Sequence, residues 1–222
     1  MKTAHTISTH PRTNSTTTSR HWARWGATVV SLAVLVTTAG SAAAEHVTPL
    51  LVCSTGPSGQ RFDVGITLPK HAEAGAVYSV RIDGVNSGKI SHFGLNYLHD
   101  MTVDYVLPAG ASYVEGSAEL VPGTGTANVQ VGPRLWHHAG VLTMVLPGRV
   151  QEGTSYTPPS IRFSLRAVGA PGSWAPVSFR RFRLQANAFL VGEVAVSCEP
   201  AVKNPYPLAG TLITAAVEAS NP

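Results

Sequence analysis

The sequence is poor in charged residues, in cysteine and in helical patterning, and each shortage narrows the choice of architecture. Charged residues make up 13% of the 222 residues, and the chain has 2 cysteines. No helical period of any length is visible. One apolar run, Ala27 to Ala39, stands out, but it is shorter than the roughly 20 apolar residues of a membrane-spanning helix. Neither a helical domain nor a permanent membrane helix is therefore favoured.

The first 44 residues have the three parts of a secretory signal peptide. A polar stretch with four basic residues and no acid precedes the apolar run, and Ala42-Ala43-Ala44 then forms an A-x-A cleavage site. We therefore expect residues 1–44 to be a signal peptide removed after Ala44, with an uncleaved anchor as the alternative. The protein is expected to be secreted or bound to the cell envelope.

The excess of positive charge lies in this leader. The chain has 16 Lys+Arg and 12 Asp+Glu, and 4 of the basic residues but none of the acids lie in residues 1–44. The remainder is neutral overall, which argues against a nucleic-acid partner because such a partner needs a basic surface. We expect membrane contact only through the leader during export.

Cys53 and Cys198 lie near the two ends of the remaining chain. In an oxidising compartment an even pair of cysteines indicates a disulfide bond, and the alternative is two free buried thiols. The bond would close a loop of about 145 residues and stabilise the fold by roughly 4–5 kcal/mol in the chain-entropy model.

Short runs of alternating apolar residues, separated by Gly- and Pro-rich turns, recur along the chain from residue 45. This pattern predicts about nine to eleven strands and an all-β fold. We expect a single immunoglobulin-like antiparallel β-sandwich over residues 45–199, and residues 200–222 as a tail that adds an edge strand or hangs loose. The strands are expected near residues 49–53, 62–68, 77–82, 101–107, 112–120, 127–131, 141–146, 161–167, 177–187 and 189–198, with 92–99 ambiguous.

Two of these runs give finer predictions. In Ile161–Ala167 every second residue is apolar, so Ile161, Phe163, Leu165 and Ala167 are expected to face the core. In Val177–Asn187 the alternation slips by one residue at Arg180-Arg181, which predicts a β-bulge there.

The segment Val77 to Leu120 resembles the immunoglobulin-like conserved repeat of bacterial surface and adhesin-like proteins. The resemblance rests on V-Y-S-V-R-I-D, on Leu107-Pro108-Ala109-Gly110 and on Tyr113-Val114, with Asp104 one residue away from the usual Asp position. It covers about a fifth of the chain and implies a sandwich fold in a surface setting, but no reaction. The overall composition also looks like that of secreted actinobacterial proteins.

No catalytic motif is present, so we expect no enzyme activity and no cofactor. The chain lacks the G-x-S-x-G pentapeptide of α/β-hydrolases. We predict no metal site; the weak candidates for zinc or copper ligands are His92, His99, Asp100 and Asp104. His99-Asp100 and His137-His138 are neighbours, so on strands their side chains would point to opposite faces. These histidines are otherwise explained as loop and rim residues.

Arginine and tryptophan supply the remaining candidates for ligand binding, namely Arg162, Arg166, Arg180, Arg181, Arg183, Trp136 and Trp174. If the strands at 161–167 and 177–187 pair, their arginines form a patch suited to phosphate or carboxylate groups; otherwise they lie on a solvated sheet face. The tryptophans are expected in loops, as contacts for carbohydrate or protein or as lids on the core.

The function expected from these observations is non-enzymatic binding, or a structural role, in the envelope. The partner would be an envelope polymer, a lipid or a protein, with anionic polymers or lipids suited to the arginines. Two alternatives remain open: a secreted hydrolase with an unrecognised site, and a lipid carrier with a cavity between its sheets.

Overall fold

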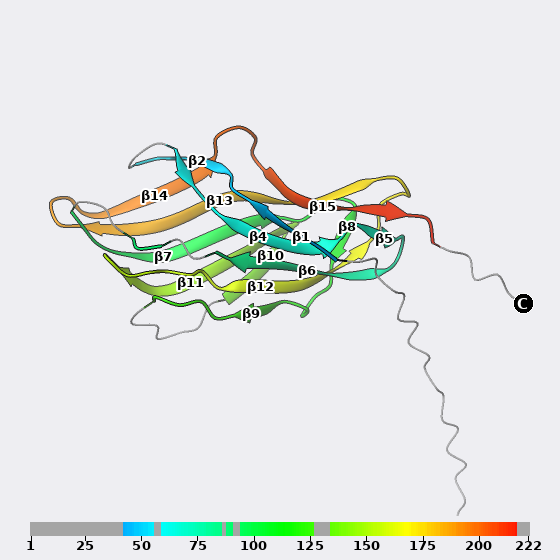
Figure 1. Cartoon of the computed structure of the whole chain (residues 1–222), viewed down its shortest axis with the longest axis horizontal. Coiled ribbons are helices and arrows are strands. Elements are labelled where there is room, and N and C mark those ends of the chain that lie inside the picture. Colours follow the sequence, from blue (N-terminus) through cyan, green and yellow to red (C-terminus); the bar gives the residue numbers. More distant parts are fainter. Residues whose placement is uncertain (1–41, 56–58, 86–87, 91–93, 127–133, 217–222) are drawn as a thin grey trace, which may run out of the picture. The chain divides into compact units, whose positions relative to one another are not determined.

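The computed structural model describes residues 42–55, 59–85, 88–90, 94–126 and 134–216. They form two β-sheets that enclose a common hydrophobic core (Figure 1). The predicted immunoglobulin-like β-sandwich is confirmed, although its 15 strands outnumber those expected. In the described part of the chain, no helix is long and apolar enough to cross a membrane.

The first sheet has the order β1-β4-β6-β12-β8, and β9 also pairs with β12. Its strands are β1 (Ala42–Val47), β4 (Val64–Pro69), β6 (Val77–Gly84), β12 (Ser160–Ala167), β8 (Ala111–Tyr113) and β9 (Glu119–Val121). The predicted inward face of β12 is confirmed, because Ile161, Phe163, Leu165 and Ala167 are all buried. The alternating sequence of β12 thus places its apolar side chains in the core and its arginines outside.

The second sheet has the order β10-β11-β7-β13-β14-β2-β3, and β15 pairs with β13 and, in parallel, with β5. Its strands are β10 (Arg134–His138), β11 (Val141–Gln151), β7 (Leu95–Val106), β13 (Trp174–Ala188), β14 (Gly192–Pro200), β2 (Leu50–Cys53), β3 (Gln60–Arg61), β15 (Tyr206–Thr214) and β5 (His71–Glu73). Leu208 and Ile213 of β15 are buried in the core, so this C-terminal strand packs as part of the sandwich.

The bulge predicted in β13 is confirmed. The pairing of β13 with β7 shifts register between Phe179 and Arg181. The ring of Phe62 lies 4.9 Å from that of Phe179 and 6.0 Å from that of Phe182, measured between centroids. Phe179 and Phe182 therefore share one face although they are three residues apart, which a regular strand does not allow.

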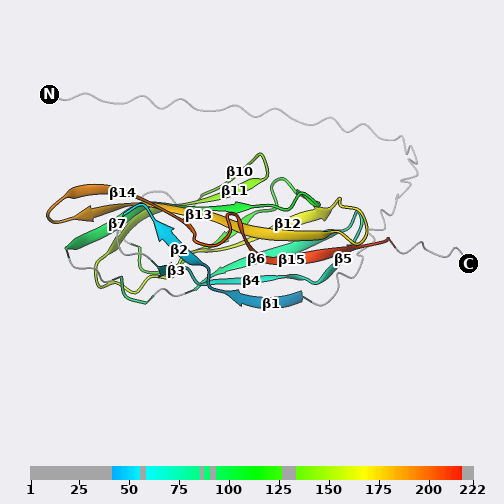
Figure 2. The same cartoon turned by 90° about the horizontal axis from the view of Figure 1, so that it is seen from above.

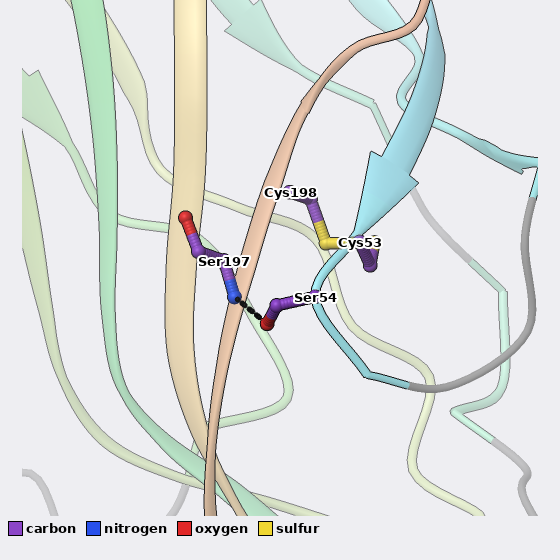
Figure 3. Close-up of a disulfide and its surroundings, with 4 residues drawn as sticks. All are labelled: Cys53, Ser54, Ser197 and Cys198. Carbon is purple, nitrogen blue, oxygen red and sulfur yellow. Dashed lines mark hydrogen bonds between the residues drawn. A yellow bond between two sulfur atoms is a disulfide. The ribbon is translucent and has the colours of Figure 1, made fainter.

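The predicted disulfide is also confirmed. Cys53 on β2 and Cys198 on β14 are opposite one another in the sheet, and their sulfur atoms are bonded at 2.05 Å (Figure 3). Beside the bond, the backbone N–H of Ser197 donates to the hydroxyl of Ser54 at 3.1 Å. The bond closes a loop of 145 residues and ties the N-terminal strand of the second sheet to a strand near the C-terminal end.

Several strand boundaries differ from the sequence-based prediction. The single strand expected at 112–120 is two strands, β8 and β9, because a turn with Gly116 at φ 73° separates them. The ambiguous run 92–99 and the run 101–107 share one strand, β7, from Leu95 onward. The strand expected at 127–131 lies outside the described residues.

The Leu107-Pro108-Ala109-Gly110 segment joins β7 of the second sheet to β8 of the first. Within it, the N–H of Ala111 donates to the carbonyl of Pro108 at 3.1 Å. This element of the family resemblance therefore serves as the corner where the chain crosses between the sheets.

The expected cleavage site overlaps the first strand. Ala42, Ala43 and Ala44 belong to β1 and pair with residues of β4 at the edge of the first sheet. Cleavage after Ala44 would leave Glu45–Val47 as the remaining part of β1. Residues 1–41 of the expected leader lie outside the described residues.

Candidate functional site

The five candidate arginines come from two strands that belong to different sheets. Strand β12 pairs with β6, β8 and β9, whereas β13 pairs with β7, β14 and β15. Because β12 and β13 do not pair with each other, their arginines do not form one joint patch. On the first sheet, Arg162 lies 3.9 Å from Glu119, and Arg166 donates to the carbonyl of Gly75 at 2.9 Å.

Arg181 and Arg183 are held by a buried carboxylate on the second sheet. Asp104 of β7 is 2% exposed, and its Oδ2 atom lies 2.6 Å from Nε of Arg181 and 3.5 Å from Nη2 of Arg183. The hydroxyl of Thr143 on β11 donates to the other carboxylate oxygen at 2.8 Å. One carboxylate thus fixes two guanidinium groups and links three neighbouring strands. Because one negative charge faces two positive charges, the cluster keeps a net positive charge.

Trp136 lies on the same outer face as these two arginines. It pairs with Thr143, which pairs with Asp104, which pairs with Arg181, so the four residues form one row across the sheet. In the parallel row two residues along, Arg134 lies at one end and Arg183 at the other. Directly opposed residues share a face, and so do residues two apart along a strand. We call Arg134, Trp136, Arg181 and Arg183 the outer-face patch.

The patch is exposed and extended. Trp136 is 58% exposed, and the side chains of Arg181 and Arg183 are 31% and 44% exposed. Three strand spacings separate Trp136 from Arg181, a span of about 14 Å. The tryptophan lies on strand β10 rather than in the expected loop. The alternation in R-L-W-H-H is the signal that indicates this strand and, with it, Arg134.

Two further candidates lie apart from the patch. Trp174 begins β13, seven residues before Arg181, and is 57% exposed. Its indole covers Gly210 of β15 so closely that a Cβ atom there would lie 2.5 Å from the ring. Arg180 is exposed at the bulge. Trp174 is therefore a surface residue that packs on a neighbouring strand.

The metal-ligand candidates do not converge. Nδ1 of His99 lies 3.0 Å from Asp100, and Nε2 lies 2.8 Å from Glu193, while Asp104 is held by the arginines. The two neighbours His99 and Asp100 meet because Asp100 has φ 50°, which interrupts the strand alternation. His92 lies outside the described residues, and within those residues no group of three or more His, Cys, Asp or Glu side chains is arranged to hold a metal ion.

A pocket of about 340 Å³ opens where β8 and β9 of one sheet approach β10 and β11 of the other. His137 lines it, 2.9 Å from Glu115 and with its ring centroid 4.4 Å from that of Tyr113. Nearby, the hydroxyl of Ser117 donates to the carbonyl of Val114 and accepts from the N–H of Ser164. The serine is thus engaged with the backbone, and the pocket offers a carboxylate–imidazole pair with no serine, threonine or cysteine among its lining residues.

The β13–β14 hairpin ends in a turn of exposed apolar residues, where the sequence pattern predicts the start of a strand. Phe189, Leu190 and Val191 are 80%, 82% and 70% exposed. The hairpin lies at the left of Figures 1 and 2 and reaches beyond the neighbouring strand β7. Gly192 has φ 74°, the conformation that closes a three-residue hairpin loop, so the glycine was the available signal.

No protein-family model and no curated protein matches the chain. Among solved structures, it is similar to a Corynebacterium diphtheriae protein described as membrane anchored, with TM-score 0.44, 12% identity, and 79% of this chain aligned with 38% of that one. The collagen-binding domain of the Erysipelothrix rhusiopathiae surface protein RspB has TM-score 0.40 and 10% identity, with coverage of 79% and 57%. The pilus 2b backbone protein of group B streptococcus has TM-score 0.35 and 13% identity, with coverage of 67% and 56%. The chain thus spans less than two thirds of each of these proteins.

Proposed function

We propose that this chain is an exported, non-enzymatic binding domain of the bacterial cell envelope, and that it holds an anionic envelope polymer on the outer-face patch. The observation that carries the proposal is the placement of Trp136, Arg181 and Arg183 on one exposed face, where Arg134 joins them. Residues far apart in the sequence are brought together there by strand pairing.

The chemistry of the patch suits a polyanion with sugar or other ring-shaped units. Guanidinium groups bind phosphate and carboxylate in a bidentate manner, and an exposed indole offers a flat apolar face. Asp104 occupies Nε of Arg181, but the same carboxylate holds both arginines in fixed positions. Because these arginine side chains are already held in place, they lose little conformational entropy when a ligand binds, and this raises the affinity.

The length of the patch favours a polymer over a single small group. Its two ends lie about 14 Å apart, further than one phosphate or carboxylate can reach. Repeating charges along a chain can engage both ends at once, which raises the overall affinity. Binding of this kind depends strongly on ionic strength because the contacts are exposed.

Sedimentation with purified cell-wall fragments tests the proposal. Arg134→Ser combined with Arg183→Ser and Trp136→Ala should weaken binding at least tenfold, while Arg181 is left intact because it makes the closer contact with buried Asp104. Arg162→Ser with Arg166→Ser is the matched control, since these arginines lie on the other sheet. A phosphate-bearing polymer should compete, and neutral dextran should not. Equal loss in both variants, or competition by dextran, would overturn the proposal.

A further inference from the structure

The apolar turn at the end of the β13–β14 hairpin, Phe189–Val191, has a composition that the turn itself does not require. Hairpin turns are usually built from glycine, asparagine, aspartate and proline, which suit the backbone geometry and water. Here Gly192 supplies the left-handed residue, and three large apolar side chains occupy the other positions. They are 70–82% exposed, so they contribute little to the core.

The hairpin holds this turn away from the sandwich on a rigid support. Its strands pair continuously from Phe182 and Cys198 to Ala188 and Gly192 at the turn. The N–H of Phe189 also donates to the carbonyl of Gly94 at 2.8 Å, which fixes the start of the turn. Because Cys198 is bonded to β2, the hairpin is covalently anchored about 20 Å from its tip.

Below the turn, polar side chains form a cluster of mixed character on one face of the sheet. The side-chain amides of Asn96 and Asn187 are joined at 2.8 Å, and the hydroxyl of Tyr97 lies 3.3 Å from Glu193. The guanidinium of Arg149 lies 4.3 Å from the centre of the Tyr97 ring. Tyrosine, arginine and amide groups are suited to the layer where lipid headgroups meet water.

We propose that the Phe189–Val191 turn inserts into the apolar layer of a lipid bilayer, with the polar cluster at the headgroups. A projecting, convex turn can enter a fluid layer without a matching pocket, and apolar residues in one continuous stretch reach that layer together. The cluster carries Arg149 for headgroup phosphates but also Glu193, so insertion depends mainly on apolar burial and not on anionic lipid. The inference does not rest on polymer binding by the outer-face patch.

Vesicles of zwitterionic phosphatidylcholine are the direct probe. The full chain should bind them, and Phe189→Ser, Leu190→Ser and Val191→Ser combined should lower the partition coefficient at least tenfold, since burying one large apolar side chain is itself worth about that factor. Any binding by the leader is the same in both proteins, so the difference reports the turn. Val52→Ser with Val202→Ser is the control, because these residues are also exposed and apolar but lie off the hairpin.

The depth to which the turn inserts is measured with the variant Leu190→Trp. In the bilayer its emission should shift to shorter wavelength than that of the parent chain and should be quenched by lipids brominated along their acyl chains. Thermal unfolding should be unchanged in the serine variant because the replaced side chains are exposed. Unchanged partitioning of the serine variant, or no quenching at position 190, overturns the proposal. The proposal is also overturned if the parent chain does not bind vesicles but forms a concentration-dependent dimer that the serine variant does not form. In that case the turn contacts a second copy of the chain.

Discussion

Asp104 on β7 and Arg181 on β13 face one another across the middle of the second sheet, and their side chains meet at 2.6 Å. The carboxylate is 2% exposed, whereas the guanidinium is 31% exposed. The pair is therefore shielded on its acidic side, where Thr143 and Arg183 complete its contacts.

Asp104→Ala should lower the free energy of unfolding by about 2–4 kcal/mol, because it leaves two guanidinium groups facing each other and a hydroxyl without its acceptor. Urea unfolding measures the loss. Asp83→Ala is the control: its pair with Arg81 has side chains 33% and 44% exposed, and exposed pairs contribute about 0–1 kcal/mol. Similar losses in the two variants would show that the Asp104 cluster is no more than a surface ion pair.

Removal of the disulfide should destabilise the sandwich without changing its fold. Cys53→Ser with Cys198→Ser frees a loop of 145 residues in the unfolded chain, and the chain-entropy model gives a loss of roughly 4–5 kcal/mol as an upper value. Urea midpoints of the parent, with and without reductant, and of the double variant give the loss directly. Reduction verified by thiol titration, with an unchanged midpoint, would contradict the expectation.

Stability should fall in alkaline solution because of buried tyrosines. Burial raises the pKa of Tyr78 from 10.0 to about 12, against a smaller opposing effect of Thr211, and burial also raises the pKa of Tyr105 and Tyr156. Between pH 10 and 12 the unfolded chain has lost these protons and the folded chain retains them, so the free energy of unfolding falls as pH rises. Below pH 10 this contribution to stability is fully present.

Tyr78→Phe should make that decline shallower, by up to about 1.4 kcal/mol per pH unit, which is the effect of one proton. Urea unfolding of the parent and the variant at intervals from pH 9 to 12 provides the comparison. Parallel curves for the two proteins would mean that Tyr78 ionises at its ordinary pH in the folded state.

The hydrogen bond from His99 is the largest cause that holds the pKa of Glu193 below its ordinary value of 4.5, and the bond from Asn187 is the second. His99→Ala should therefore raise the pKa of Glu193, and Asn187→Ala should raise it less. Carbon-13 NMR of the carboxyl group across the acid range measures both. A larger rise in the asparagine variant would reverse the assignment of cause.

The local sequence pattern was sufficient to predict some structural features and not others. The alternation in β12 predicted its buried face, and the slip at Arg180-Arg181 predicted the bulge, because both follow from the two-residue period of a strand. The expected export signal and an even cysteine count together predicted the Cys53–Cys198 bond. Each of these inferences needed only neighbouring residues or a count.

The candidate site depended on pairing between distant segments. Whether β12 and β13 lie side by side is decided by the whole sandwich, so the sequence did not reveal that Arg162 and Arg181 belong to different sheets. Apolar periodicity likewise does not separate an exposed turn from a strand, so it predicts a strand at Phe189–Val191 where the structure has a turn. The contact between His99 and Asp100 was not predicted either, because the left-handed backbone of Asp100 interrupts the alternation of side chains along the strand.

The covalent link between β2 and β14 also determines how the protein bears mechanical load. Tension applied between the N- and C-terminal ends passes from β2 through Cys53 and Cys198 to β14, so residues 54–197 lie outside the load path. Stretching can peel β1 from β4 and β15 from β13, but it cannot extend the segment within the loop while the bond is intact. Under tension between the two ends of the chain, the outer-face patch and the β13–β14 turn would therefore keep their positions, because both lie within residues 54–197.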